Sequence, residues 1–589
     1  DWAWSFDISL HQVDTEIVYL VAQTLVWFLS STNNTVRDQV TKSLVNLLEQ
    51  QAEILIRILK TFKKVSDWYI LDRLYAVTYG CILRTEEKES IQKIAQYIYD
   101  ITFKNGEPPL HILIRDYARN TIEYAISKKI ELNIDIRKIL PPYDTKFNYK
   151  PLSNDELDKK YKPKDKSGNW RNENWGITAI LKSMVTEYGR GIGMYGDFGR
   201  YVFQREISNF ELPKKLNIDL LSNLAVEWIF EKYGYNTKLH GEYDSSIVAL
   251  ASNIEERIGK KYQWIALHQI LAIVSDNCKM NSRYSDTENR YQGAWQLDVR
   301  DIDPAYITKD KKESEVKTTS QDYNKWWNDI EYSYWDTSDS KWKESLDDLI
   351  DPQQIIQKKD KEDQEWLYLQ HSTKWKEPEV FKIAEDEKRR REICYLIQGL
   401  LVKKKDKQEI INYLKEKRFW GRWLPENKDD YSSLINREKF WSPAYKEQYA
   451  ENIWKTIDNT KYEVIVSTES AKGIFDRDSS GANQPYNIPC RYIFEGMKLK
   501  YTTFDCGLSL DEGKTIVINT KPDSVLIRKK ELINFLDQND LDIIWTLVGE
   551  KFLYIKNKQE EWYLAELEGL FYLEENNVKK EFFKLYNRE

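Results

Sequence analysis

Three short motifs in which Arg and Asp are adjacent recur in the first part of the chain at nearly constant spacing. Their arginines are Arg37, Arg73 and Arg115, which lie 36 and 42 positions apart. A period near 40 residues is typical of HEAT and armadillo units, whose helix pairs stack and bury their faces on neighbouring pairs. The spacing therefore predicts HEAT-like helical repeats over residues 1–142. An irregular helical bundle in which the motifs recur by chance is the alternative.

Length and local composition divide the rest of the chain. At 589 residues the protein is too long for one hydrophobic core. We expect a mainly α, multidomain protein, in which the repeats are followed by an irregular aromatic-rich α region and a C-terminal α+β domain. The expected boundaries are 1–142 for the HEAT-like repeats, 143–175 for a linker or long loop, 176–460 for the mainly helical, aromatic-rich region, and 461–589 for the α+β domain.

Hydrophobic periodicity places individual elements in these regions. Residues 255–272 predict a helix with a charged entry and an apolar stripe at Ile258, Tyr262, Ile265, Ile270 and Leu271. Further helices are expected at 384–402, 407–417 and 529–536. Strands are expected at 463–467, 492–494, 515–518, 552–555 and 562–565.

Composition bears on the compartment and on the class of partner. The net charge is -7 and the pI is about 5.7, which argues against a general nucleic-acid binder. No apolar run reaches the ~18 residues of a membrane helix, and no signal peptide is visible. The five cysteines are scattered without a Cys-x-x-Cys pair, so we expect a cytoplasmic protein. Because the chain opens on Asp1 in an aromatic segment, we expect it to be part of a longer protein.

Motifs that resemble cofactor sites fail in detail. Gly513-Lys514-Thr515 ends like a phosphate-binding loop, but Leu508 stands where the first glycine belongs, and a strand pattern follows. The segment from Asp476 to Gly481 matches the first half of a calcium loop, yet Asn487 occupies the position of the bidentate glutamate.

The remaining titratable residues carry weak signals. Asp298, Asp301 and Asp303 could hold Mg²⁺, although Asp before Pro is also ordinary turn chemistry. The five histidines are isolated in sequence, and His268, on the 255–272 helix, is expected to be a core or capping residue. We therefore predict no catalytic, cofactor-binding or metal-ligating residue, and no enzymatic activity, for this chain.

Aromatic residues crowd one polar segment. Trp and Tyr supply large contact area at low entropic cost and dominate the energetics of protein interfaces. We interpret the segment as a partner-binding surface; packing of these rings onto their own domain is the alternative. The residues are Tyr323, Trp326, Trp327, Tyr332, Tyr334, Trp335 and Trp342.

Several blocks of sequence together resemble the C-terminal region of large bacterial ATP-binding proteins, the Avs-type antiviral STAND NTPases, which share their plan with NOD-like receptors. The blocks span most of the chain and carry no catalytic chemistry. They are residues 65–77, 255–272, 300–304, 419–426, 440–445, 526–529 and 547–551.

This resemblance implies a function. In that family an N-terminal effector and an ATPase precede a helical-repeat sensor, which recognises a folded phage protein such as a terminase or portal subunit and triggers oligomerisation. By resemblance, ATP and Mg²⁺ belong to the parent protein, which would form a homo-oligomer on activation. The β-rich tail departs from the mostly helical sensor of the family. A cytoplasmic helical-repeat scaffold, or an enzyme whose site is assembled from distant residues, are the alternatives.

Overall fold

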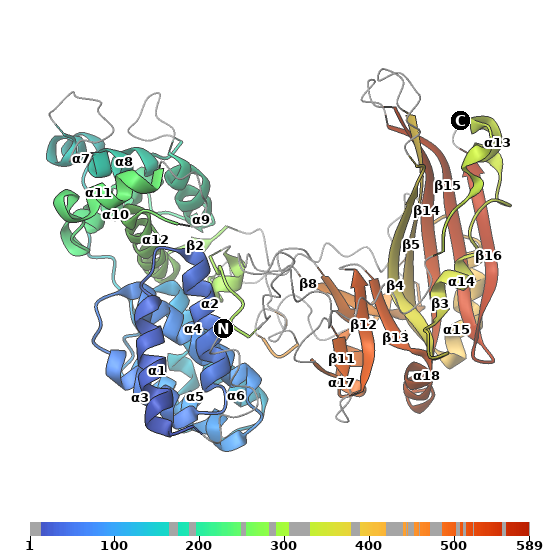
Figure 1. Ribbon diagram of the computed structural model, residues 1–589, viewed down its shortest axis with the longest axis horizontal. Helices are drawn as coiled ribbons and strands as arrows, with labels where there is room; N and C mark the ends of the chain where they lie inside the picture. The colour runs from blue at the N-terminus through green and yellow to red at the C-terminus, as the bar shows by residue number, and fades with distance from the viewer. Residues whose placement is uncertain are drawn as a thin grey trace. The chain divides into compact units, whose positions relative to one another are not determined.

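The chain forms two compact units, which we describe separately (Figure 1). Unit 1 comprises Asp1–Lys309, Ser433–Lys446 and Gly473–Asn483, and unit 2 comprises the remaining residues. The computed structural model describes residues 13–163, 175–187, 196–248, 255–281, 290–297, 299–305, 330–378, 389–419, 440–442, 445, 453–458, 460–471, 486–501, 507–509, 514–521, 524–555 and 561–587.

The first six helices of unit 1 stack in two layers (Figure 1). In one layer α3 packs against α1 and α5, and in the other α4 packs against α2 and α6. A helical N-terminal region is thereby confirmed, whereas its assignment to the HEAT type stays a prediction. The bounds are α1 (Thr15–Phe28), α2 (Asn34–Leu48), α3 (Ala52–Phe62), α4 (Trp68–Arg84), α5 (Lys88–Thr102) and α6 (Ile112–Ser127).

Side-chain caps fix where these helices begin. Asn33 accepts the N–H of Val36 at the start of α2, and Asp67 accepts the N–H of Tyr69 at the start of α4. Such caps satisfy backbone donors that have no partner within the helix. The Arg-Asp motifs of α2 and α4 consequently lie within the first two turns of their helices. We call the layer formed by α2, α4 and α6 the inner layer.

The rest of unit 1 is helical around a central helix, α12 (Ile258–Asn277). The predicted helix at 255–272 is confirmed. Its burial is not limited to the predicted apolar stripe, because every residue from Ile265 to Ser275 is buried, on all sides of the helix. The other described elements are α7 (Asn154–Tyr161), α8 (Trp175–Ser183), α9 (Gln204–Ile207), β1 (Phe210–Glu211), α10 (Ile218–Glu227), α11 (Thr237–Val248), β2 (Lys279–Met280) and short 3-10 or π turns.

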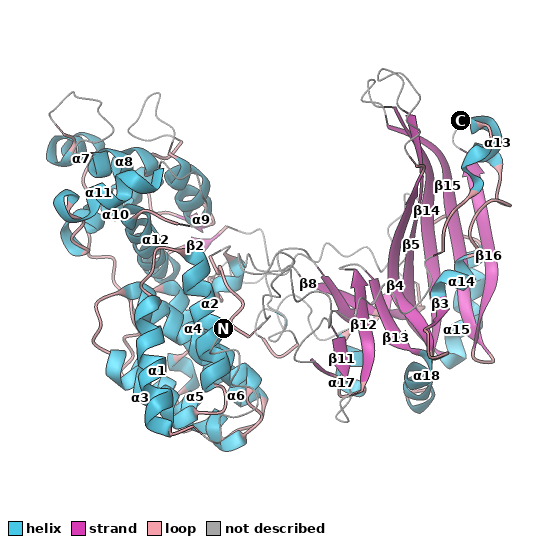
Figure 2. Ribbon diagram, viewed as in Figure 1, coloured by secondary structure: helices cyan, strands magenta, loops and turns pink. Residues whose placement is uncertain are grey.

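Unit 2 is built on one antiparallel sheet with short helices (Figure 2). Its described strands run in the order β10-β11-β12-β13-β4-β5-β14-β15-β16, with β3 paired to β4 and β7 paired to β5 and β6. The longest strands are β4 (Glu365–Lys376), β5 (Arg389–Lys403), β14 (Leu541–Ile555), β15 (Glu561–Glu574) and β16 (Asn577–Asn587). The shorter ones are β3 (Gln357–Lys359), β6 (Lys455–Thr456), β7 (Glu463–Val466), β10 (Lys500–Tyr501), β11 (Gly507–Ser509), β12 (Thr515–Lys521) and β13 (Ser524–Arg528). A separate pair is formed by β8 (Thr468–Ala471) and β9 (Tyr486–Pro489).

Both faces of this sheet are covered. Along β14 the side chain of Trp545 lies in one apolar cluster and that of its neighbour Ile544 lies in another, as the two-residue period of a strand requires. Helix α18 (Lys529–Gln538) contributes to the Trp545 cluster, and α15 (Lys407–Lys415) contributes to the Ile544 cluster. Strands β5 and β14 each have a short apolar run in which neighbouring residues are all buried, at 400–402 in β5 and at 543–545 in β14. The remaining described helices are α13 (Asp339–Glu344), α14 (Pro352–Ile356) and α17 (Arg491–Gly496).

Two predicted elements are wrong. The described part of the helix expected at 384–402, residues 389–402, is strand β5, because β4 and β14 pair along its two edges. A short apolar run cannot be assigned to helix or strand by periodicity alone, and pairing decides it here. The strand expected at 492–494 is helix α17. The sheet also recruits β4 and β5 from the region predicted as mainly helical. The helices expected at 407–417 and 529–536 and the other four predicted strands are confirmed. None of the described helices is long and apolar enough to cross a membrane.

Gly80 lets α4 lie directly against the segment that ends at Ala305. A Cβ atom at Gly80 would lie 2.7 Å from the carbonyl oxygen of Pro304 and 2.7 Å from a methyl group of Val45. We predict that Gly80→Ala destabilises the protein by about 1–3 kcal/mol, because backbone and a packed side chain must move apart. Denaturant unfolding measures the change. Gly106→Asn is the control, since nothing lies within 4 Å of that position and Asn tolerates its positive φ. An unchanged midpoint for Gly80→Ala contradicts the prediction.

Candidate functional site

A polar pocket of ≈ 160 Å³ lies in unit 1, between the inner helices α2 and α4, helix α12 and the segment 299–305. No Ser or Cys belongs to its described wall, so a covalent nucleophile of those types is missing there. Charged residues of both signs dominate it. The lining residues are Asn34, Arg37, Asp38, Tyr69, Asp72, Arg73, Glu256, Trp264, His268, Val299, Arg300 and Asp301.

The first two Arg-Asp motifs meet at this pocket. The guanidinium of Arg73 on α4 forms ion pairs with Asp38 on α2 at 2.9 Å and with Asp301 at 2.7 Å. Arg37 lies 3.9 Å from the same carboxylate of Asp301. The side chains of Arg73 and Asp38 are each 3% exposed, whereas that of Asp301 is 46% exposed. Partial desolvation in the pocket opposes the charge of Asp301, but the guanidiniums of Arg73 and Arg37 outweigh this effect and hold the pKa of Asp301 below its usual value.

The third motif is paired in the same way. Asp116 on α6 binds Arg300 at 2.6 Å, and both side chains are buried. Because Arg300 and Asp301 are adjacent, the segment 299–305 is held by α6 through one residue and by α4 through the next. Buried charges are tolerated only where they are paired and hydrogen-bonded. These pairs therefore fix the position of the pocket wall.

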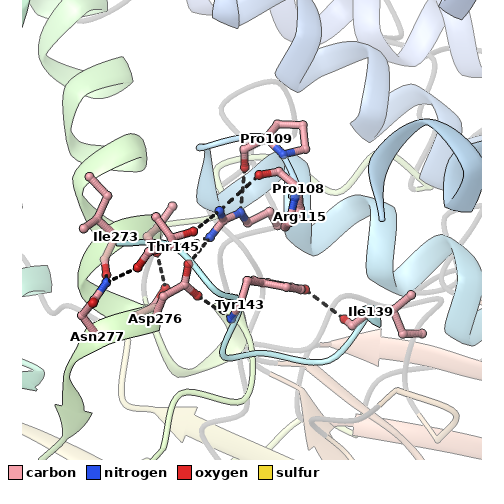
Figure 3. Close-up of polar contacts among 11 residues, drawn as sticks. Pro108, Pro109, Arg115, Ile139, Tyr143, Thr145, Ile273, Asp276 and Asn277 are labelled. Atoms are coloured by element: carbon pink, nitrogen blue, oxygen red, sulfur yellow. Dashed lines mark hydrogen bonds and ion pairs between the residues drawn. The ribbon is translucent and has the colours of Figure 1, made fainter. Parts of the chain in front are cut away.

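Arg115 ties α6 to α12 (Figure 3). Its guanidinium pairs with Asp276 at 2.8 Å and donates to the carbonyl of Pro109 and to the hydroxyl of Thr145. The backbone N–H of Tyr143 donates to the other oxygen of Asp276. Burial raises the pKa of Asp276, and Arg115 acts in the opposite direction. This network sets the distance between the helices that carry His111 and His268.

Asp72, His111 and His268 come together beside the pocket. Each offers a metal-ligating atom, and the three atoms lie within 4.8 Å of one another. The side chains come from α4, from the residue that caps α6 and from α12, and all three are buried. His111 stacks on Trp68, and its ring centroid lies 4.9 Å from that of His268.

Polar atoms of this trio lack hydrogen-bond partners within the described part of the chain. They are Oδ1 of Asp72, Nε2 of His111 and both ring nitrogens of His268. Each such buried atom costs about 1–3 kcal/mol unless something binds it. Burial raises the pKa of Asp72 to about 7, against the opposing effect of Arg73. Burial also lowers the pKa of His268 to about 4 and places that of His111 well below its usual value, so both imidazoles are neutral at pH 7.

Sequence reasoning missed this trio. His268 was expected to be a core or capping residue, and it is buried, but its proximity to Asp72 and His111 depends on three separate helices. One signal was present. In α4 the order of the motif is inverted to Asp72-Arg73, so the carboxylate falls one position before the arginine instead of after it. Asp38 and Asp116 meet arginines, whereas no ion pair to Asp72 occurs among the described residues.

None of the residues that the sequence suggested for magnesium, calcium or phosphate binding belongs to this trio. Asp301 pairs with arginines, while Asp303 accepts the N–H of Ala305 in a turn. Strand β12 begins at Thr515, directly after Lys514, as the objection to a phosphate loop required. Asp298 and the calcium-loop candidate from Asp476 to Gly481 lie outside the described residues.

The aromatic segment of unit 2 divides into buried and exposed members. Tyr332 and Trp342 are buried in the core of unit 2 and are inaccessible to a partner in this fold. Trp335 is partly buried against the same core, and the side chain of Tyr334 is 53% exposed. For the two buried rings, packing onto their own domain is the correct interpretation. Tyr323, Trp326 and Trp327 lie outside the described residues, so a partner surface there stays a prediction.

A hydrogen-bonded chain holds the buried aromatics. The indole N–H of Trp342 donates to Tyr332, whose hydroxyl donates to Asp348 at 2.6 Å. Lys551 on β14 completes the chain, because its ammonium lies 3.1 Å from Asp348 and donates to the carbonyl of Ser345. Burial lowers the pKa of Lys551, and Asp348 raises it. The segment is therefore attached to the sheet by polar bonds as well as by apolar contact.

Comparisons with known proteins identify no relative of this chain. No protein-family model matches the chain, and no curated protein matches it significantly.

We predict that Trp342→Ala and Tyr334→Ala separate the two kinds of aromatic residue. Trp342→Ala should cost about 3–5 kcal/mol of unfolding free energy, because it leaves a cavity and removes the donor to Tyr332. Tyr334→Ala should stay within about 0.5 kcal/mol, as is usual for exposed positions. Urea unfolding monitored by tryptophan fluorescence measures both. Equal effects of the two changes are incompatible with the described core.

We also predict that Asp276→Asn destabilises unit 1 by about 3 kcal/mol or more, because Arg115 is left buried without its counter-ion. Glu16→Gln is the matched control, since its ion pair with Arg57 lies at the surface with both side chains about half exposed. The control should leave the thermal midpoint unchanged within error. The interpretation is wrong if the two substitutions give the same midpoint.

Proposed function

We propose that this chain is a protein-recognition module, the ligand-sensing C-terminal part of an antiviral STAND NTPase, and that the pocket of unit 1 receives a polar side chain of its partner. The partner is a folded phage protein such as a terminase or portal subunit. Binding triggers homo-oligomerisation of a cytoplasmic parent protein, whose ATP and Mg²⁺ are bound upstream of this chain. The six-helix stack is assigned to the HEAT type in this proposal.

The observation that carries the proposal is the pocket itself. Its walls are already ordered by buried ion pairs, so binding does not have to immobilise long charged side chains. Its volume of ≈ 160 Å³ is below the roughly 300–1,000 Å³ typical of pockets for drug-sized ligands. A single side chain of a larger partner fits this size better than a nucleotide does. Energetic hot spots of protein interfaces are side chains of this kind, inserted into desolvated pockets.

The chemistry of the wall favours a polar side chain. Asp301 presents a half-exposed carboxylate, and the buried carboxylate of Glu256 accepts from the indole of Trp264 at 3.2 Å. One guanidinium nitrogen of Arg73 has no hydrogen-bond partner among the described residues. The pocket therefore offers both donors and acceptors. A site that hydrogen-bonds its ligand rejects analogues lacking the bonding group, which suits a sensor.

The proposal is tested by binding purified terminase and portal proteins to the chain and to two variants. Asp301→Asn should weaken binding at least about tenfold, since it removes the most accessible charge of the pocket. Asp100→Asn is the matched control: its side chain is similarly exposed and ion-paired in the same unit, but it lies outside the pocket. The control should bind as the wild type does. Circular dichroism of each variant establishes that the comparison concerns folded protein.

Two outcomes would count against the proposal. Wild-type affinity of a folded Asp301→Asn variant would remove the pocket from the recognition surface. A parent protein without Walker A and Walker B motifs upstream of this chain would remove the STAND assignment and favour a helical-repeat scaffold.

A further inference from the structure

The proposed recognition function assigns no role to the trio of Asp72, His111 and His268, although Asp72 and His268 belong to the pocket wall. The residues are 39 and 157 positions apart in sequence (72 to 111, then 111 to 268), yet their ligating atoms lie within 4.8 Å of one another. Two ligands of a tetrahedral Zn²⁺ are about 3.4 Å apart, given zinc–nitrogen distances near 2.1 Å. Adjustments of side-chain rotamers are therefore enough to bring the three atoms onto one ion.

We propose that Asp72, His111 and His268 bind one divalent transition-metal ion, with Zn²⁺ as the preferred occupant. Two imidazoles and one carboxylate are a ligand set suited to Zn²⁺ and also to Fe²⁺. Three protein ligands leave one coordination position open. Asp72 and His268 also belong to the pocket wall. This inference does not depend on the proposed protein partner.

The protonation states suit a metal. The two buried imidazoles are neutral, which is the form that binds metal ions. Asp72 is an unpaired carboxyl group in a buried site, and a cation would stabilise its charged form. Coordination would use Oδ1 of Asp72, Nε2 of His111 and one of the two ring nitrogens of His268, all of which lack hydrogen-bond partners among the described residues.

Surrounding charges leave room for a cation. Arg73 is compensated by Asp38 and Asp301, and Arg115 is compensated by Asp276. Asp72 is consequently a carboxyl group beyond those that the arginines need, and with a pKa of about 7 it is ionised in part at neutral pH. The charged groups acting on the trio are Arg37, Arg73, Arg115, Asp116 and Asp301.

Two proton changes accompany binding of the ion: Asp72, whose pKa is about 7, releases any proton that it holds, and His111 changes its tautomer. Nδ1 of His111 accepts the backbone N–H of Ile114 at 3.4 Å, so the neutral ring carries its proton on Nε2. Coordination through Nε2 shifts that proton to Nδ1 and ends the contact with Ile114. Because 3.4 Å is long for a hydrogen bond to nitrogen, little is lost. Stacking on Trp68 keeps the ring in place during this change.

The test uses the full chain, stripped of metal with a chelator and titrated with Zn²⁺ by calorimetry. One equivalent should bind, and the melting temperature should rise on binding. His268→Gln is the main variant, because neither ring nitrogen of His268 has a hydrogen bond to lose among the described residues. It should weaken zinc binding more than about a hundredfold, since loss of a mere outer-shell partner already costs 10–100-fold. His240→Gln, a histidine of the same unit outside the trio, should bind as the wild type does.

A second measurement keeps the test decisive if His268→Gln does not fold. Co²⁺ bound to the wild-type chain should give the intense visible bands of a four-coordinate ion with nitrogen and oxygen ligands, and Zn²⁺ should displace it. Thiolate charge-transfer bands would place the ion at a cysteine and overturn the proposal. Absence of stoichiometric binding, or equal zinc affinity of the wild-type, His268→Gln and Asp72→Asn chains, would overturn it as well. Tighter binding of Fe²⁺ than of Zn²⁺ would overturn the preferred occupant.

Discussion

Burial of charged side chains between the inner helices requires each arginine to meet a carboxylate, and the arrangement of unit 1 follows from that requirement. Arg73 reaches Asp38 on the preceding inner helix, and Arg115 reaches Asp276 on α12. A shift of either helix by one turn would leave a buried charge without its partner, which is among the most costly changes in a protein interior. The pairs thus specify the register of the stack, in addition to whatever stability they add.

The ion pairs between these arginines and carboxylates also hold the wall of the pocket in place. Asp301 is shared by Arg37 and Arg73, and Arg300 is used by Asp116, so the wall is rigid before any ligand arrives. Asp72 is outside this scheme, and it lies beside two neutral imidazoles. Burial raises the pKa of this carboxyl group, and a bound cation would stabilise its ionised form.

In unit 2, buried polar bonds attach a polar segment to the sheet. Its sheet is apolar on both faces, and α15 and α18 cover opposite faces. The polar segment before α14 cannot add many aliphatic contacts, so it is attached by Tyr332 and Trp342 together with the buried ammonium of Lys551. Aromatic rings with polar tips serve well here, since they fill space and also satisfy a hydrogen bond.

By itself the sequence determined those elements whose signal is local: the helical first region, the α12 helix, and strands such as β7 and β12 with their β-branched alternation. The spacing of Arg37, Arg73 and Arg115 predicted successive units of a repeat, and the structure buries all three arginines in ion pairs. Tertiary structure decided the rest. The apolar run of β5 is compatible with a helix or a strand, and only pairing with β4 and β14 selects the strand. The meeting of Asp72, His111 and His268 depends on how three helices pack, and no local pattern encodes that packing.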